Sequence, residues 1–531
     1  MVSIAGPQMK VLLMDKETTT IVSCAFAQSE MMQKEVYLFE KLDSPAPRDT
    51  VRHLKCIVFV RPTQENIQLL TQELRNPKYA QYYIFFSNII SKTEVKALAE
   101  ADDQETVRDV HEFFIDGVAL SQQLFVLNQR HIYDNSYNLT VPAFLRIKQG
   151  LIGLMLSMKK RAVIRYQRSS EHCHKLAEEL GQVMRREEGL FENNKSDTLL
   201  LIMDRSEDPI TPLLNQWTYE AMVHELIGIQ NSKVSMDNQT FILSELHDDF
   251  FSHNVTSNFG DLCQNIKILM NEFQEKSKIH KKLDSIADMK NFVDEYPQFK
   301  KISGTVSKHM ALAERLNTIV GSDNLFEVSE LEQSIWARGD HSACLEKIRT
   351  LLNHPKTTKI NAIRLVLLYA LRFEAHANQD IRGLITLLKA KDPNCGQYVT
   401  ALLRYAGSSR RSNDLFGQGS TMEMTKKYLK DLKGVENVYT QHEPYIKQIV
   451  DNLIRGRLSE QAYPYVSGEI GSFRQDYVII FIVGGASFEE SAYVRTMNEK
   501  RAQGSGAPSL ILGTTFMHNT STFIEQFSGS R

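Results

Sequence analysis

The feature that most constrains the fold is a pair of short apolar segments near the end of the chain. Asp476–Val483 and Ser509–Leu512 are predicted strands, and a helix is predicted between them from Phe488. Two strands with one crossover helix cannot form a sheet of their own, because both outer edges would stay unpaired. We therefore predict that they complete the sheet begun by the strand at Thr198–Asp204. The largely helical segment in between is then an insertion.

A separate α/β unit is predicted at the start of the chain, where short apolar runs alternate with amphipathic ones. The predicted strands are Lys10–Asp15, Val36–Leu42, Cys56–Val60 and Tyr82–Ser87, and the predicted helices are Glu65–Leu74 and Thr93–Ala101. This alternation predicts a parallel sheet with helices on its faces. The strands lack polar alternation, which indicates burial on both faces.

These patterns predict an α/β plus α protein with two parallel α/β sheets and an inserted helical domain. A chain of 531 residues is longer than one hydrophobic core usually serves. We assign 1–128 to the first α/β domain, 129–230 together with 467–531 to a discontinuous second α/β domain, and 231–466 to the helical domain.

Composition excludes several classes of partner. The chain has 62 lysines and arginines against 64 acidic residues, so no strong net field draws it to nucleic acid or to anionic lipid. Its six cysteines contain no Cys-x-x-Cys pair, which is typical of reduced thiols in the cytosol. No leader or membrane span is predicted, since Leu365–Leu371 is bracketed by two arginines. We expect a cytoplasmic chain without a nucleic-acid partner.

No motif predicts a catalytic centre, a cofactor or a metal site. The His-Glu pairs lack the second histidine of a zinc helix. Gly484-Gly485 follows a predicted strand but belongs to no complete phosphate-binding pattern, so tight packing between strand and helix is the better interpretation.

One enzymatic alternative remains at the end of the strand Thr198–Asp204. Asp204 and Asp208 lie where α/β enzymes place catalytic groups, and together they could support a metal-assisted phosphohydrolase. The competing interpretation is a rigid turn in which Asp204 makes a local bond to Arg205.

The segment 286–320 has apolar residues at helical spacing on both sides of Pro297. A proline inside a helix costs about 3 kcal/mol, so we predict a helical hairpin or a kinked arm here. The arm is either ordinary core packing or an element that changes shape when a partner helix binds.

Several motifs in order give the chain a resemblance to a known family. They are Lys10–Asp15, Asp204–Asp208, Thr211–Leu214, Trp217–Tyr219, Pro297–Phe299, Gly434–His442 and Val483–Ala486. On these residues the chain resembles the SM family of syntaxin-binding membrane-fusion regulators across its length. The likeness is to the branch that serves endosomes and the trans-Golgi network.

The resemblance implies an arch of three domains that binds and does not catalyse. A cavity between the first and third domains would hold the helical bundle of a syntaxin-type SNARE, and a separate pocket would hold the N-terminal peptide of syntaxin. The implied function is to promote assembly of the SNARE complex, including binding of the assembled complex. The chain would reach endosomal and Golgi membranes through these partners.

The resemblance also implies site residues. The positions matched to the N-peptide pocket are Val95, Val110 and Glu112, and those matched to the cavity and hinge are Glu40, Pro297 and Phe299. Apolar anchors beside a carboxylate suit a short peptide with an apolar and a basic residue. The alternative for the pocket is two core valines and a surface glutamate.

Overall fold

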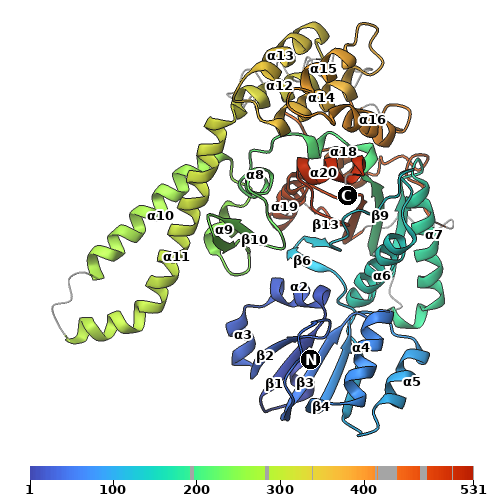
Figure 1. The fold of residues 1–531 in the computed structure, drawn as a ribbon, viewed down its shortest axis with the longest axis vertical. Helices are drawn as coiled ribbons and strands as arrows, with labels where there is room; N and C mark the ends of the chain where they lie inside the picture. Colours follow the sequence, from blue (N-terminus) through green and yellow to red (C-terminus); the bar gives the residue numbers. More distant parts are fainter. Residues whose placement is uncertain are drawn as a thin grey trace.

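The computed structural model describes most of the chain. The described residues are 1–191, 197–280, 286–337, 339–412, 415–416, 439, 441–466, 475–504 and 506–529, without the side chains of 188, 276–280 and 286–299. Figure 1 shows one sheet at the bottom of the view, a second sheet above it, a helical region at the top and a long helical arm to one side.

The first sheet has five parallel strands in the order β2-β1-β3-β4-β5. They are β1 (Lys10–Met14), β2 (Val36–Lys41), β3 (Val51–Val60), β4 (Tyr79–Phe86) and β5 (Val107–Glu112). Its helices are α1 (Val2–Ala5), α2 (Lys16–Ala25), α3 (Gln28–Gln33), α4 (Gln64–Arg75) and α5 (Lys92–Ala101). The four predicted strands and two predicted helices are present, whereas β5 was not predicted.

The second sheet has six strands in the order β6-β7-β13-β12-β9-β8. They are β6 (Val118–Ser121), β7 (Leu124–Val126), β8 (Ala162–Tyr166), β9 (Thr198–Asp204), β12 (Tyr477–Val483) and β13 (Ser509–Thr514). β12 lies between β9 and β13 and pairs with both in parallel, which confirms the pairing predicted for the terminal strands.

The strands β6 and β7 lie inside the range 1–128 predicted for the first domain, yet they belong to the second sheet. β7 pairs in parallel with β13, from Leu124 opposite Leu512 to Val126 opposite Thr514. This pairing covers the outer edge of β13, which the terminal strands alone would leave open. The last strand of the first sheet ends at Glu112.

The second sheet is flanked by helices from both parts of the chain. They are α6 (Val141–Met158), α7 (Glu171–Arg186), α8 (Tyr219–Leu226), α18 (Tyr445–Ile454), α19 (Phe488–Ala502) and α20 (Thr520–Ser528). Of the described helices, α6 is long and apolar enough to span a membrane, but 56% of that helix is buried inside the protein.

The helical region at the top of Figure 1 packs around one central helix. Its helices are α12 (Leu325–Ala337), α13 (His341–Asn353), α14 (Lys359–Phe373), α15 (Ile381–Leu388) and α16 (Cys395–Ala406). Nearly every residue of α14 is buried, which explains its long apolar run. The apolar spacing of residues 422–432 also predicts a helix, but these residues lie outside the described ones. A small antiparallel hairpin, β10 (Lys233–Met236) and β11 (Gln239–Ile242), was not predicted in this largely helical segment.

The arm is formed by α10 (Phe259–His280) and α11 (Ile286–Ser322), which lie side by side (Figure 1). Residues 286–320, predicted to form a hairpin or kinked arm by themselves, lie within the single helix α11, and the hairpin is made with α10. A proline removes its own N–H bond from a helix and its ring crowds the preceding turn, which can bend a long helix without reversing the chain. The side chains of Pro297 and Phe299 lie outside the described residues.

Candidate functional site

One edge of the first sheet carries exposed apolar side chains. Val110 on the edge strand β5 is 39% exposed, and Val95 on α5 is 37% exposed. Val110 lies opposite Ile84 of β4, which packs in the same apolar cluster as Leu98 of α5. Val110 therefore lies on the face that α5 covers. These two valines are surface residues, which argues against their interpretation as core valines.

Glu112 joins the end of β5 to the start of α5. Its Oε1 accepts a hydrogen bond of 2.8 Å from the backbone N–H of Ile90, directly before the N-cap Ser91 of α5. The rest of the Glu112 side chain is exposed. The structure thus places Glu112 against the first turn of α5, which carries Val95. We call this surface, formed by Val95, Val110 and Glu112, the edge groove.

Glu40 lies at the opposite edge of the same sheet, on β2, where it pairs with Leu13 of β1. It is half-buried, and it does not lie near the edge groove because three strands separate β2 from β5. Large exposed apolar side chains surround this edge; they are Phe26, Met32, Tyr37 and Leu38. In Figure 1 the β2 edge with α3 and the arm lie on the same side of the molecule.

A cavity of about 430 Å³ lies where the two sheets meet. It is lined by the first turns of α2, by residues 117–130 around β6 and β7, by Glu220 of α8 and by the start of α19. Burial raises the pKa of Glu220 to about 8, and the nearby Glu245 adds to this rise. Glu220 is therefore largely protonated at neutral pH.

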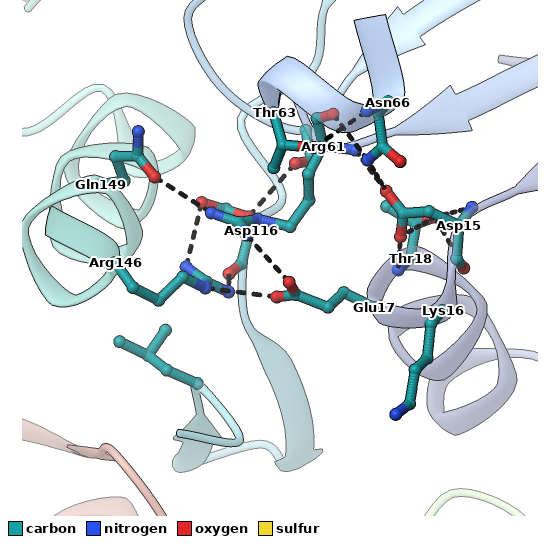
Figure 2. A network of polar contacts seen from close by, with 12 residues as sticks. Asp15, Lys16, Glu17, Thr18, Arg61, Thr63, Asn66, Asp116, Arg146 and Gln149 are labelled. Atoms are coloured by element: carbon teal, nitrogen blue, oxygen red, sulfur yellow. Dashed lines mark hydrogen bonds and ion pairs between the residues drawn. The ribbon is translucent and has the colours of Figure 1, made fainter. Parts of the chain in front are cut away.

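A network of charged groups connects the first sheet to α6 beside this cavity (Figure 2). Asp116, whose side chain is fully buried, accepts from Arg61 Nε at 2.9 Å and from Arg146 Nη1 at 3.1 Å. Glu17 of α2 bridges the same two arginines at 2.9 and 3.2 Å. Figure 2 shows Lys16 pointing away from this network. We call Glu17, Arg61, Asp116 and Arg146 the junction network.

The two arginines of the junction network respond differently to the same carboxylates. Burial alone would lower the pKa of Arg61, but Asp116 and Glu17 outweigh it and the pKa is raised. Burial dominates for Arg146, whose pKa is lowered despite Asp116. The network therefore depends on its carboxylates staying ionised, since they keep both guanidinium groups stable inside the protein.

The predicted catalytic pair, Asp204 and Asp208, is fully used inside the fold. Asp204 accepts from Ser206 N at 2.9 Å and from Ser170 Oγ at 2.7 Å. Asp208 accepts from Thr211 N at 3.0 Å and pairs with Arg205 at 3.0 Å. Both carboxylates are buried. The phosphohydrolase alternative gains no support from this arrangement.

Arg205 differs from the prediction in its partner. It does not bond to Asp204 but pairs with Asp208 and makes two bonds of 2.7 and 2.8 Å to Glu490 of α19. Burial alone would raise the pKa of Asp208, yet Arg205 outweighs it and the pKa is lowered. The sequence prediction missed this partner because Glu490 lies 285 residues away from Arg205, and no local pattern could have identified it. We call Arg205, Asp208 and Glu490 the core triad.

The Gly484-Gly485 turn packs as the sequence predicted. Both residues have a positive φ, at 97° and 98°. A Cβ at Gly484 would lie 2.7 Å from the Tyr133 hydroxyl, and one at Gly485 would lie 2.0 Å from His518 Cδ2. The turn is thus closed by the protein's own side chains and leaves no room for a phosphate.

In the part of the chain that the structure describes, no three histidine, cysteine, aspartate or glutamate side chains gather to hold a metal ion. The six cysteines are all free thiols, and only Cys263 is exposed. The chemistry available at the described surfaces is therefore that of apolar contacts, carboxylates and backbone edges.

Comparison with known proteins matches the whole chain. The Sec1 family model covers residues 10–526. The chain is 47% identical over 549 residues to vacuolar protein sorting-associated protein 45 of Mus musculus, covering 100% of this chain and 94% of the relative. It is 32% identical over 558 residues to the protein of that name from Saccharomyces cerevisiae, covering 99% and 95%.

Solved structures share the fold over nearly the full length. "SM Protein Vps45 in Complex with Qa SNARE Tlg2" superposes with a TM-score of 0.89 at 38% identity, covering 99% of this chain and 95% of that chain. A more distant match, the Unc18 chain of the Unc18-syntaxin 1 complex from Monosiga brevicollis, has a TM-score of 0.80 at 18% identity over 99% and 98% of the two chains. This second likeness is one of fold alone.

Proposed function

Because the chain belongs to the Sec1 family, we propose that it is a regulator of vesicle fusion that binds a Qa-SNARE of the syntaxin type and promotes SNARE complex assembly. The observation that carries this proposal is the full-length similarity to a chain solved with the Qa-SNARE Tlg2. The chain binds its partners without turnover. It acts from the cytoplasmic side of endosomal and Golgi membranes, to which these partners bring it.

The edge groove is the proposed site for the N-terminal peptide of the Qa-SNARE. Val95 and Val110 each leave more than a third of their apolar surface exposed. One carboxylate oxygen of Glu112 accepts a hydrogen bond from the backbone N–H of Ile90, and the other is available to a basic residue of the peptide. A short peptide needs a few such anchors rather than a large area.

Calorimetry of the purified chain with a synthetic Qa-SNARE N-peptide tests this site. Val110→Arg removes an apolar anchor and puts a long cationic side chain in the place of the peptide, where it competes for Glu112, so binding should weaken by about tenfold or more. Val141→Arg is the matched control, because Val141 is a 72% exposed valine on α6, away from the groove. Equal affinities for the two variants would reject the groove.

The β2 edge and the arm are the proposed contact surfaces for the helical bundle. Glu40 supplies a half-buried carboxylate among exposed apolar residues, which is a mixture that suits an amphipathic helix. Pro297 and Phe299 are proposed at the hinge of the arm on the resemblance alone. Pro297→Ala should restore the backbone N–H bond that proline removes from the continuous helix α11, and so stiffen it and strengthen binding of the SNARE bundle.

A pulldown with the assembled Qa-SNARE bundle tests these surfaces. Glu40→Lys should reduce capture by about tenfold, whereas Glu330→Lys, an exposed glutamate on α12, should not. A reconstituted liposome fusion reaction then separates binding from promotion of assembly. Fusion that proceeds at the same rate with and without the chain would overturn the regulatory role.

A further inference from the structure

A buried chain of polar side chains lies at the base of the arm. The Tyr219 hydroxyl lies 2.7 Å from Nδ1 of His309, and Nε2 of His309 lies 2.9 Å from Oδ2 of Asp248. Tyr219 and His309 are 0% exposed and Asp248 is 5% exposed. Such groups are costly to bury and are kept only when they are fully paired.

The geometry assigns one tautomer to His309. Nε2 faces a carboxylate, so it carries the proton and donates to Asp248, while Nδ1 accepts from the Tyr219 hydroxyl. Burial lowers the pKa of His309 although Asp248 opposes this, so the ring is neutral at physiological pH. Each group then has a single role, and the two bonds define one orientation of the ring.

The three side chains come from three different elements. Tyr219 is the first residue of α8, Asp248 caps α9 (Asp249–Asn254) through the N–H of Phe251 at 2.9 Å, and His309 lies on α11. Lys308, the neighbour of His309, also pairs with Asp248 and donates to the carbonyl of Ile242 at 3.0 Å. One turn of α11 is thereby tied to α8, α9 and the β10–β11 hairpin.

His309 lies near the point where the arm leaves the body. Among the described side chains of α11, the buried apolar ones are Val306, Leu312, Leu316 and Val320. These contacts hold the helix but tolerate sliding, because apolar packing is not directional. Hydrogen bonds weaken steeply away from their preferred angle, so they fix the direction in which the helix leaves.

We propose that His309 is the positioning residue that sets the angle of the α10–α11 arm, and that this angle selects the geometry of the helix the arm receives. The inference rests on the proposed function of the arm. From His309 to the start of α11 the helix is about 35 Å long. A tilt of about 10° at the base would thus move the tip by about 6 Å, more than half the spacing of packed helices.

Three variants separate orientation from packing. His309→Leu fills the site with an apolar side chain of similar size but loses both hydrogen bonds. His309→Gln retains one acceptor and one donor in reach of the same partners. Tyr219→Phe removes a single hydroxyl without opening a void. We expect the arm to be mobile in His309→Leu, partly so in Tyr219→Phe, and restored in His309→Gln.

The measurement is the distance between spin labels on the arm and on the body. Gln274→Cys on α10, well along the arm, and Glu65→Cys on α4 are exposed sites, used together with Cys263→Ser so that no exposed native thiol is labelled. The distance distribution should broaden by about twofold in His309→Leu and stay narrow in His309→Gln, because a tilt at the base is amplified at the label. Should His309→Leu not fold, Tyr219→Phe decides in the same way.

Binding of the two SNARE segments completes the test. His309→Leu should weaken capture of the helical bundle by about tenfold and leave the N-peptide affinity unchanged, since the edge groove is on the first sheet. Narrow distributions in both His309→Leu and Tyr219→Phe would overturn the proposal. A broad distribution with unchanged bundle affinity would keep the positioning role of His309 but reject the arm as the site of binding.

Discussion

The carboxyl ends of the two sheets are built from the same parts and differ in how far water reaches them. In the first sheet Asp15 follows β1 and accepts from Thr18 N and from Arg61 N, each at 2.7 Å. In the second sheet Asp204 follows β9 and accepts from Ser206 N at 2.9 Å. Each end also holds arginines paired with carboxylates. The Glu17 side chain of the junction network is 41% exposed, whereas no side chain of the core triad exceeds 4%.

This difference teaches what the two ends do. In α/β enzymes the carboxyl end of the sheet holds the reacting groups. Here both ends are filled by the protein's own ion pairs. The junction network, in which only Glu17 reaches water, lies between two parts of the molecule, and the fully buried core triad lies inside one part. The exposure of the acid therefore predicts the energetic weight of each pair.

The largest effect is expected from the core triad. Glu490→Ala leaves Arg205 buried with only Asp208, so the free energy of unfolding should fall by about 3–5 kcal/mol. Chemical denaturation measures this. Glu499→Ala is the control on the same helix, because Glu499 is 55% exposed and its partner Arg495 keeps its other bonds to Glu245 and Ser252. If Glu490→Ala lowered the free energy of unfolding by less than Glu499→Ala, burial would not make the core triad the stronger of the two sheet ends.

A smaller effect is expected in the junction network. Asp116→Asn removes the charge between Arg61 and Arg146 but leaves Glu17 in place, so stability should fall by about 2 kcal/mol. Hydrogen exchange should show the loss in α6 and α2 rather than across the whole chain. Uniform loss of protection would mean that the network is core and not a junction.

Glu220 sharpens the comparison because burial and the nearby Glu245 outweigh the attraction of Arg495. Its folded pKa of about 8 lies above the ordinary value of 4.5, so this side chain lowers stability progressively as pH rises through that range. Glu220→Gln should stabilise the protein by about 1–2 kcal/mol at pH 8 and change little at pH 4.5. Melting curves at both pH values measure this, and an equal shift at the two values would contradict it.

The smallest effect is expected for Glu17→Ala. This carboxylate is partly in water, and exposed ion pairs contribute about 0–1 kcal/mol. In chemical denaturation this small loss should shrink further from low to high salt, because salt screens exposed charges. A loss as large as that of Asp116→Asn would show that exposure does not set the weight of these pairs.

Strands that are buried on both faces could be predicted from the sequence more readily than the edge strand β5. β1, β3, β4 and β12 are runs of large apolar residues because both faces of their sheets are covered, and all were predicted. β5 was missed because an edge strand alternates exposed and half-buried residues, including three charged ones. A charged edge strand such as β5 is thus hard to identify from periodicity, whereas the more apolar edge strand β2 was predicted.

The candidate sites show the same limit. Val95 and Val110 follow from a resemblance, since no local pattern distinguishes an exposed valine from a buried one. Arg61 and Asp116 are 55 residues apart, and Tyr219 and His309 are 90 apart. Contacts of that separation arise from the fold, so neither the junction network nor the Tyr219–His309 hydrogen bond at the base of the arm could be predicted from spacing.

The strand order of the first sheet sets a length requirement for any partner that holds both of its edges. Four strand spacings separate β2 from β5, which is about 19 Å in a straight line. An extended chain covers this distance with no fewer than about six residues, and the path around the helices requires more. A partner that binds the edge groove and the β2 edge at the same time thus needs a flexible linker between its two binding segments. Shortening that linker should prevent simultaneous binding and abolish the gain in affinity from the second contact.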